Sequence, residues 1–312
     1  MSRISIKWNK YGLVIAFVVW CVVVAIMEPA FLTTSNLLNV LRQISMVSII
    51  AIGAFLAVLT GGIDLSVGSV AALSGVVAAI VMKRFGMAVA WGVMGGVLIG
   101  ALIGVANGVM ITRMKMAAFI ATLISMNFAK GLAFIFTDGV PISGLPRPFV
   151  FLGRGYLFSL PFPIVIMAVV FVATAWIMHE TRFGMRVYGI GGNAEAVRLS
   201  GVNVQRYLRI VYLVSGATAG LGGVLLASRL DSGTPNVGES YVFDAITAVV
   251  LGGTSLSGGS GRIVGVFLGS IFMGTLGNGL NLLNVPSYWQ LIAKAVLLAV
   301  AVGIDIKAKN EK

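Results

Sequence analysis

Ten long apolar runs divide this chain of 312 residues, and they limit its possible folds more than any other feature. A helix that crosses a membrane needs about 20 mostly apolar residues. Only 10% of the residues are charged, against about 25% in soluble domains, so the composition excludes a soluble protein. We expect an all-α polytopic membrane protein, a single domain over residues 1–312 with about ten transmembrane helices. The runs cover residues 11–27, 43–60, 66–82, 86–111, 117–136, 162–179, 208–228, 242–257, 263–283 and 287–304.

The basic residues predict the orientation. With the N-terminus inside, the inner segments carry fourteen of the 22 Lys and Arg, among them Arg3, Lys7 and Lys312, and the outer segments carry six. Lys130 and Lys294 remain within runs. Inner loops of membrane proteins are enriched in Lys and Arg, and this distribution along short loops does not indicate a nucleic-acid surface. We therefore expect a multi-pass membrane protein with both termini in the cytoplasm.

Proline supports the same orientation independently. All eight prolines fall on segments that this orientation places outside, and proline collects in loops because it interrupts helices. Four of them lie in an outer Pro-rich loop at about residues 137–161.

Glycine recurs every four residues along the fourth run. Such a row lies on one helix face and lets another backbone approach closely. Ordinary tight packing is the favoured interpretation, and a helix beside a transport pathway is the alternative. The row consists of Gly92, Gly96, Gly100, Gly104 and Gly108.

A nine-residue segment occurs twice. Residues 61–69 reappear as residues 252–260 with six identical positions. Paired hydrophobic segments interrupted by glycine indicate a transport pathway, because broken helices are tolerated at membrane depth only inside protein or along a water-filled cavity. The candidate pathway residues are Gly61, Gly62, Asp64, Ser66, Gly68, Gly252, Gly253, Ser255, Ser257 and Gly259.

Asp64 is the carboxylate of the first copy. It could cap a helix beginning near Leu65, or it could carry a proton or line the pathway. Ser255 occupies the matching position of the second copy. Because serine caps helices but carries no proton at neutral pH, the capping role is favoured.

Motifs of the common enzyme classes do not occur. The sequence contains no G-x-x-x-x-G-K-[ST] phosphate loop, no H-E-x-x-H and no G-x-S-x-G. Residues 258–261 match the G-x-S-G of intramembrane serine proteases, but the single histidine, His179, precedes them rather than following. Cys21 is the single cysteine, which excludes a thiolate metal site. We expect no catalytic residue, no metal and no cofactor bound by this chain.

The longest inner segment, at about residues 180–208, contains residues that favour the two ends of a helix. Asn193 is a good N-cap and Gly201 a good C′ residue, so a helix of about two turns is expected between them. The residues alone leave two interpretations open, a loop on the membrane surface and a docking helix for a cytoplasmic partner.

Three stretches together resemble a known family. Residues 59–69, 181–201 and 252–261, in this order and continuing to Trp289, are similar to the ribose/xylose/arabinose-type permeases, the membrane subunits of bacterial ABC sugar importers. The resemblance covers essentially the whole chain, and it implies a multi-pass protein of the bacterial inner membrane. It implies that the 180–208 segment couples to an ATPase, which would bind the ATP. The candidate coupling residues are Arg182, Gly184, Arg186, Gly189, Gly192, Asn193, Glu195, Arg198 and Gly201.

The resemblance also implies partners and a function. The partners are a second permease, either an identical copy (a homodimer) or a homologue, cytoplasmic ATP-binding subunits and a periplasmic or extracellular sugar-binding protein, which residues 138–163 would contact. The function would be import of a monosaccharide, a ribose-like pentose or a related sugar, by alternating access. One alternative is an ion-coupled secondary transporter that uses Asp64 and Asp244, and another is a passive channel.

Overall fold

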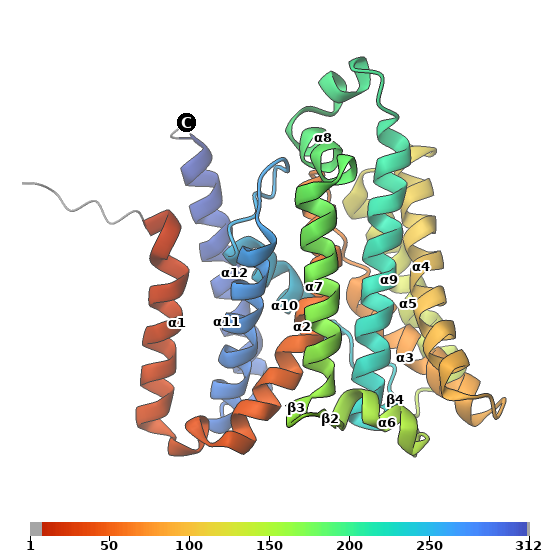
Figure 1. Ribbon diagram of the computed structural model, residues 1–312, viewed down its shortest axis with the longest axis vertical. Coiled ribbons are helices and arrows are strands. Elements are labelled where there is room, and N and C mark those ends of the chain that lie inside the picture. The colour runs from red at the N-terminus through yellow and green to blue at the C-terminus, as the bar shows by residue number, and fades with distance from the viewer. Residues whose placement is uncertain (1–7, 311–312) are drawn as a thin grey trace, which may run out of the picture.

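The computed structural model describes residues 8–310, and it is a bundle built almost entirely of helices (Figure 1). Arg3, Lys7 and Lys312, on which the orientation partly depends, lie outside the described residues. The helices within residues 8–310 are α1 (Trp8–Met27), the 3-10 helix η1 (Pro29–Leu32), α2 (Thr34–Leu59), α3 (Val67–Lys83), α4 (Val89–Thr112), α5 (Ala118–Thr137), α6 (Arg147–Arg154), α7 (Phe162–Glu180), α8 (Arg182–Leu199), α9 (Val204–Leu230), α10 (Glu239–Leu251), α11 (Ile263–Leu282) and α12 (Ser287–Asn310).

All ten apolar runs coincide with helices, but the helices differ in length. Among the described residues, six helices are long and apolar enough to cross a membrane, namely α2, α4, α5, α7, α9 and α11. The apolar stretches of α1, α3 and α12 are shorter, and α10 has 13 residues. The structure therefore supports a polytopic helical membrane protein, and the count of ten spans stays a prediction.

Two helix boundaries differ from the sequence expectation. The second run was expected to begin at residue 43, but α2 begins at Thr34, where the Thr33 hydroxyl caps it by accepting the Asn36 N–H at 3.4 Å. The polar residues of the first turns concealed this start. The eighth run was expected to reach residue 257, but α10 ends at Leu251 because the following glycines turn the chain.

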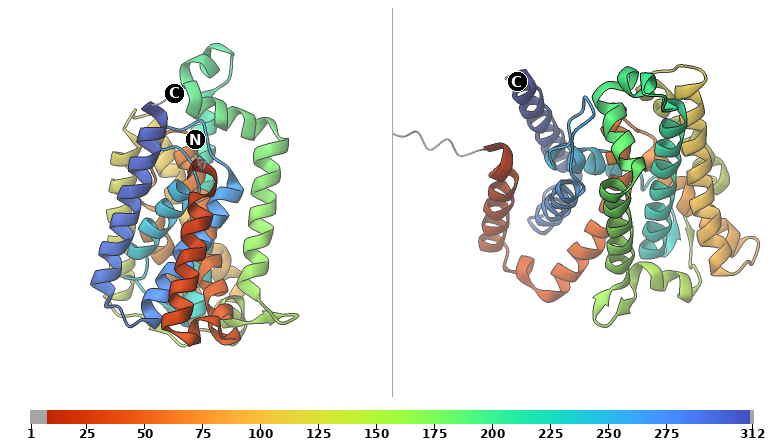
Figure 2. Two further views of the ribbon diagram at one scale, coloured as in Figure 1. Left: turned by 90° about the vertical axis from the view of Figure 1, so that its left-hand side faces the viewer. Right: turned by 45° about the horizontal axis from the view of Figure 1, so that its top comes forward.

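The two ends of the bundle are distinct. The helix α8 and both described chain ends lie at one end, which we call the α8 end (Figures 1 and 2). The opposite end carries α6 and two short antiparallel ribbons, whose strands pair β1 with β4 and β2 with β3 (Figure 1). The strands are β1 (Ile142–Ser143), β2 (Tyr156–Leu157), β3 (Leu160–Pro161) and β4 (Ser232–Gly233).

The core lies around α2 and α9. Both helices are largely buried, whereas most apolar residues of α4, α5 and α7 are half-buried or exposed. Exposed apolar side chains along whole helices are expected where the surrounding solvent is lipid. The outer helices of the bundle thus have the surface of a membrane protein.

The glycine row of α4 packs against α9. A Cβ atom added to Gly100 would lie 2.4 Å from the carbonyl oxygen of Gly216, and one added to Gly104 would lie 2.2 Å from that of Tyr212. These distances mean that the two backbones are in contact, which is the tight packing favoured from the sequence.

Two short helices, α3 and α10, begin side by side inside the bundle. A Cβ atom on Gly68 would lie 2.2 Å from the Gly238 carbonyl oxygen, and one on Gly238 would lie 1.9 Å from that of Gly68. From this meeting point α3 runs toward the end with α6, and α10 runs toward the α8 end. Non-helical segments lead to both starts, residues 60–66 from the α8 end and residues 231–238 from the other. Irregular backbone at this depth is tolerated because protein surrounds it.

Candidate functional site

The first copy of the repeat begins where α2 ends. The Gly61 N–H donates to the Val58 carbonyl at 2.9 Å and the Gly62 N–H to the Ala57 carbonyl at 3.0 Å. This is the Schellman pattern, which places its C′ residue in the left-handed region. Gly61 occupies that position with φ +80°, so the glycine is required by the turn itself.

The second copy terminates α10 with the same pattern, one residue later in the repeat. The Gly253 N–H donates to Val250 and the Thr254 N–H to Val249, and Gly253, the second glycine of its pair, has φ +80°. The two copies also continue differently. In the first copy a helix starts at Val67, whereas residues 252–262 of the second form a loop before α11.

Asp64 connects the first loop to α9. It is 1% exposed. One carboxylate oxygen accepts the Ser66 N–H at 2.9 Å and the Ser66 hydroxyl at 2.6 Å, and the other accepts the Ser215 hydroxyl at 2.7 Å. The expected helix start near Leu65 is wrong by two residues, and Asp64 bonds to the residue that precedes the helix. Its geometry is that of an anchor at the start of α3.

Ser255 repeats part of this arrangement. Its hydroxyl accepts the Ser257 N–H at 3.4 Å, which matches the bond between Asp64 and Ser66. The carboxylate of this copy comes from elsewhere in the chain, because Asp305 of α12 accepts the Leu256 N–H at 3.2 Å. Sequence reasoning did not identify Asp305, which lies far from the repeat along the chain.

The two repeat loops meet α8 in one cluster. The Gly259 N–H donates to the Leu59 carbonyl at 2.9 Å. A Cβ atom on Gly191 of α8 would lie 1.9 Å from that carbonyl oxygen and 2.3 Å from the Gly259 nitrogen. We call Leu59, Gly191 and Gly259 the junction. It brings the expected pathway loops and the expected coupling segment together, and it includes Leu59 and Gly191, which the sequence did not single out.

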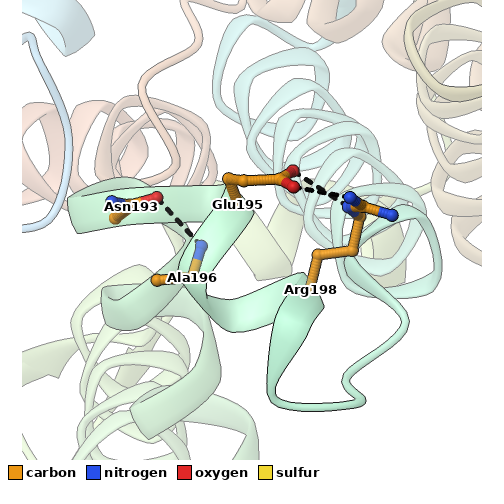
Figure 3. Close-up of polar contacts among 4 residues, drawn as sticks. All are labelled: Asn193, Glu195, Ala196 and Arg198. Carbon is orange, nitrogen blue, oxygen red and sulfur yellow. Dashed lines mark hydrogen bonds and ion pairs between the residues drawn. The ribbon is translucent and has the colours of Figure 1, made fainter.

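The expected caps of the coupling segment are present in α8. The Ala196 N–H donates to the Asn193 side chain at 3.0 Å (Figure 3), and Gly201 follows the helix with φ +81°. The expected two-turn helix after Asn193 is therefore confirmed, and a further helical segment precedes it. α8 begins at Arg182 and is interrupted at Asn193, where φ is −158°. The backbone is not helical at this residue, and the Asn193 side chain caps the second half of α8.

The second half of α8 is exposed. Glu195 and Arg198 form an ion pair on its surface, with one hydrogen bond of 2.9 Å (Figure 3). The hydrogen bonds from Arg198 hold the pKa of the Glu195 carboxyl below its usual range. Leu199 is 75% exposed. An exposed leucine beside an exposed ion pair is a surface suited to a protein partner.

The other candidate coupling residues serve the first half of α8. Gly184 packs on the backbone of α7, where a Cβ atom would lie 2.0 Å from the Met178 carbonyl oxygen. Arg186 donates to the Tyr207 hydroxyl at the start of α9. Gly189 lies beside Val197, whereas Arg182 and Gly192 are exposed.

Asp244 has a partner within the membrane-spanning helices. It is 5% exposed in α10, and the Lys294 ammonium of α12 lies 2.7 Å from one of its oxygens. Lys294, one of the two basic residues within apolar runs, is thereby neutralised. Asp64 and Asp244 have separate sets of partners.

Comparison with known proteins decides the family. Residues 36–301 match the family described as the permease component of branched-chain amino acid transport systems. The chain belongs to this permease family. It is 47% identical to the ribose import permease protein RbsC of Bacillus subtilis (strain 168), over 96% of this chain and 93% of that protein.

Further relatives agree. The chain is 45% identical to RbsC of Escherichia coli (strain K12), over 94% of this chain and 92% of that protein. It is 39% identical to the L-arabinose transport system permease protein AraH of the same strain, over 96% and 90%. No solved structure matches. The resemblance to sugar-importer permeases is thus confirmed.

Proposed function

We propose that this chain is the membrane-spanning permease subunit of a bacterial ABC importer that moves a monosaccharide, a ribose-like pentose or a related sugar, into the cytoplasm. A separate ATPase subunit would supply the energy, and this chain would bind no ATP. The names of the relatives support the sugar. The contact of α8 with both repeat loops supports the mechanism, and it is the observation on which the proposal chiefly depends.

The junction has the properties of a mechanical connection. Gly191 contacts the backbone of Leu59 at the end of α2 and of Gly259 in the loop after α10. Because no side chain separates these backbones, a displacement of α8 cannot be absorbed by a rotamer change. An ATPase that binds the exposed half of α8 would therefore directly move the end of α2 and the loop after α10.

The proposal assigns the two ends of the bundle to the two sides of the membrane. The α8 end, with both ends of the described part of the chain, faces the cytoplasm and the ATP-binding subunits. The opposite end, with α6 and the short strands, faces the periplasmic or extracellular sugar-binding protein. A second permease copy or a homologue completes the pathway, which alternates between outward and inward openings.

The ion-coupled alternative needs carboxylates that exchange ions in the membrane. Asp244 is paired with Lys294, and Asp64 accepts three hydrogen bonds from two serines. Carboxylates held in this way serve better as anchors than as carriers. The relatives likewise favour the ABC importer over a secondary transporter or a passive channel.

The test removes the exposed half of α8. We expect deletion of residues 194–199, or Asn193→Pro, to abolish co-purification with the ATP-binding subunits and ATP-dependent uptake of ribose. The control is Phe158→Ser at the opposite end, where the side chain is 93% exposed, and it should keep ATPase binding. Intact ATPase binding and uptake after the deletion would refute the mechanism.

A further inference from the structure

An ion pair on the outer surface of the bundle has no obvious structural role. The Lys130 ammonium of α5 contacts the Glu239 carboxylate at the first residue of α10, and their side chains are 43% and 65% exposed. The pair therefore lies on the outside of the chain and not in its core. Asp244 and Lys294, by contrast, are 7% and 11% exposed.

The depth of this pair follows from helix geometry. Lys130 is twelve residues from the start of α5, and Glu239 is twelve residues from the end of α10. At 1.5 Å per residue, both lie about 18 Å from the α8 end of their helices. From Gly68, which touches Gly238, α3 continues for about 22 Å to the other end of the bundle. The pair is thus close to the middle of the membrane.

Charged groups at this depth do not face lipid. Ionisable residues within membrane-spanning segments almost always face a bundle interior or a water-filled cavity. Because the surface with Lys130 and Glu239 is exposed on this chain alone, it must face water, a second chain, or both. Figure 2 shows α5, α10 and α12 on the opposite side of the bundle from α7.

The same surface offers both polar and apolar groups. Asn127 precedes Lys130 by almost one helical turn of α5, and its side chain is exposed. Phe243 follows Glu239 by one turn of α10 and is 50% exposed. A carboxylate, an ammonium and an amide can bond to hydroxyl groups, and an aromatic ring can cover an apolar C–H face. A monosaccharide presents both kinds of surface.

The position of Glu239 is fixed by the backbone contact between Gly68 and Gly238. A Cβ atom added to either glycine would lie 1.9 to 2.2 Å from the carbonyl oxygen of the other. The start of α10 therefore cannot shift without moving α3. Gly68, a candidate pathway residue, therefore has a structural role. It holds the first residue of α10 at the exposed surface.

We propose that Lys130 and Glu239, together with Asn127 and Phe243, form the contact point for the monosaccharide at the middle of the translocation pathway, on the face that a second permease chain covers. This inference rests on the proposed function and locates its pathway. Sugar hydroxyls would replace part of the interaction between the two charges. The contact is weak and reversible because the charges pair again when the sugar leaves.

The first experiment measures access of water. In a Cys21→Ser background, Glu239→Cys and Asn127→Cys are placed in the full transporter in membranes and treated with a charged methanethiosulfonate reagent. Val172→Cys on α7 is the control, because its side chain is 70% exposed at similar depth on the side away from α5. We expect labelling at positions 239 and 127, slowed by D-ribose, and none at 172. Labelling of positions 239 and 127 no faster than that of 172 would overturn the proposal.

The second experiment measures transport. Glu239→Gln and Lys130→Met should each lower ATP-driven ribose uptake about tenfold, since a hydrogen bond to a charged group contributes that much. Co-purification with the ATP-binding subunits should persist. The charge exchange Lys130→Glu with Glu239→Lys tests a purely structural pair, and full recovery of uptake in it would contradict the sugar contact. Absence of ATP-driven uptake by the unchanged chain would instead refute the proposed function, whatever the labelling shows.

Discussion

The backbone N–H of Gly259 donates to the carbonyl of Leu59 at 2.9 Å, which joins the loop after α10 to the last residue of α2. Gly191 of α8 lies against both groups. Two segments that resemble each other in sequence are thus connected to each other and to a third segment by backbone alone.

Gly191→Ala should disrupt this connection. The new methyl group would lie 1.9 Å from the Leu59 oxygen, and backbone cannot move aside as a flexible side chain can. Overpacking of this kind costs about 1–3 kcal/mol, so we expect a lower unfolding temperature and lower ribose uptake. The matched control is Gly192→Ala, whose methyl group would meet nothing within 4 Å. Equal effects of the two substitutions would contradict the junction.

Asp64→Asn and Asp64→Ala should differ. Asparagine keeps an oxygen for the Ser66 N–H and an amide that can donate to the Ser215 hydroxyl, so we expect most of the uptake to remain. Alanine leaves buried donors without an acceptor, which costs about 1–3 kcal/mol. Uptake and thermal unfolding of both variants are the measurements. Loss of uphill uptake in Asp64→Asn, with normal stability, would instead indicate a proton carrier.

Gly104→Ala should separate α4 from α9. Its methyl group would lie 2.2 Å from the Tyr212 carbonyl oxygen, and the expected loss of stability is about 1–3 kcal/mol. Gly95→Ala in the same helix is the control, because its nearest neighbour would be 3.5 Å away. Thermal unfolding in detergent compares the two, and a similar unfolding temperature for both would argue against the backbone contact.

Lys294→Met should destabilise the protein strongly. It leaves the Asp244 carboxylate buried without its partner, a change that costs about 3–5 kcal/mol. The double variant Lys294→Met with Asp244→Asn removes the charge as well and should recover most of the stability. Expression level and unfolding temperature report both effects. If the double variant unfolds no later than the single variant, the ion pair is not the cause.

Local signals in the sequence predicted local structure well. Asn193 and Gly201 could be predicted as the start and the end of a helix, because capping depends on residues that are close in the sequence. The glycine row of α4 likewise predicted a packing face. The register of the repeat was misleading, since the left-handed residue is Gly61 in one copy and Gly253, the second glycine of the pair, in the other.

Contacts between segments that are distant along the chain could not be predicted from the sequence. Lys130 was noticed as a charge inside an apolar run, but its partner Glu239 lies more than a hundred residues away. The segment of residues 231–238 is short, contains Pro235 and resembles an ordinary loop. Nothing in its sequence indicates that it enters the bundle. Nothing in the sequence distinguishes Gly191 from other glycines, because its role follows from its contact with the end of α2.

The glycine row of α4 also limits which parts of the molecule can take part in transport. Helices separated by side chains can slide, because rotamers rearrange as they pass. α4 and α9 touch through Gly100, Gly104 and the backbone of α9, so any sliding would drive peptide groups into one another. We therefore expect these two helices to move as one rigid unit in the proposed transport cycle, with the hinge of that cycle outside them.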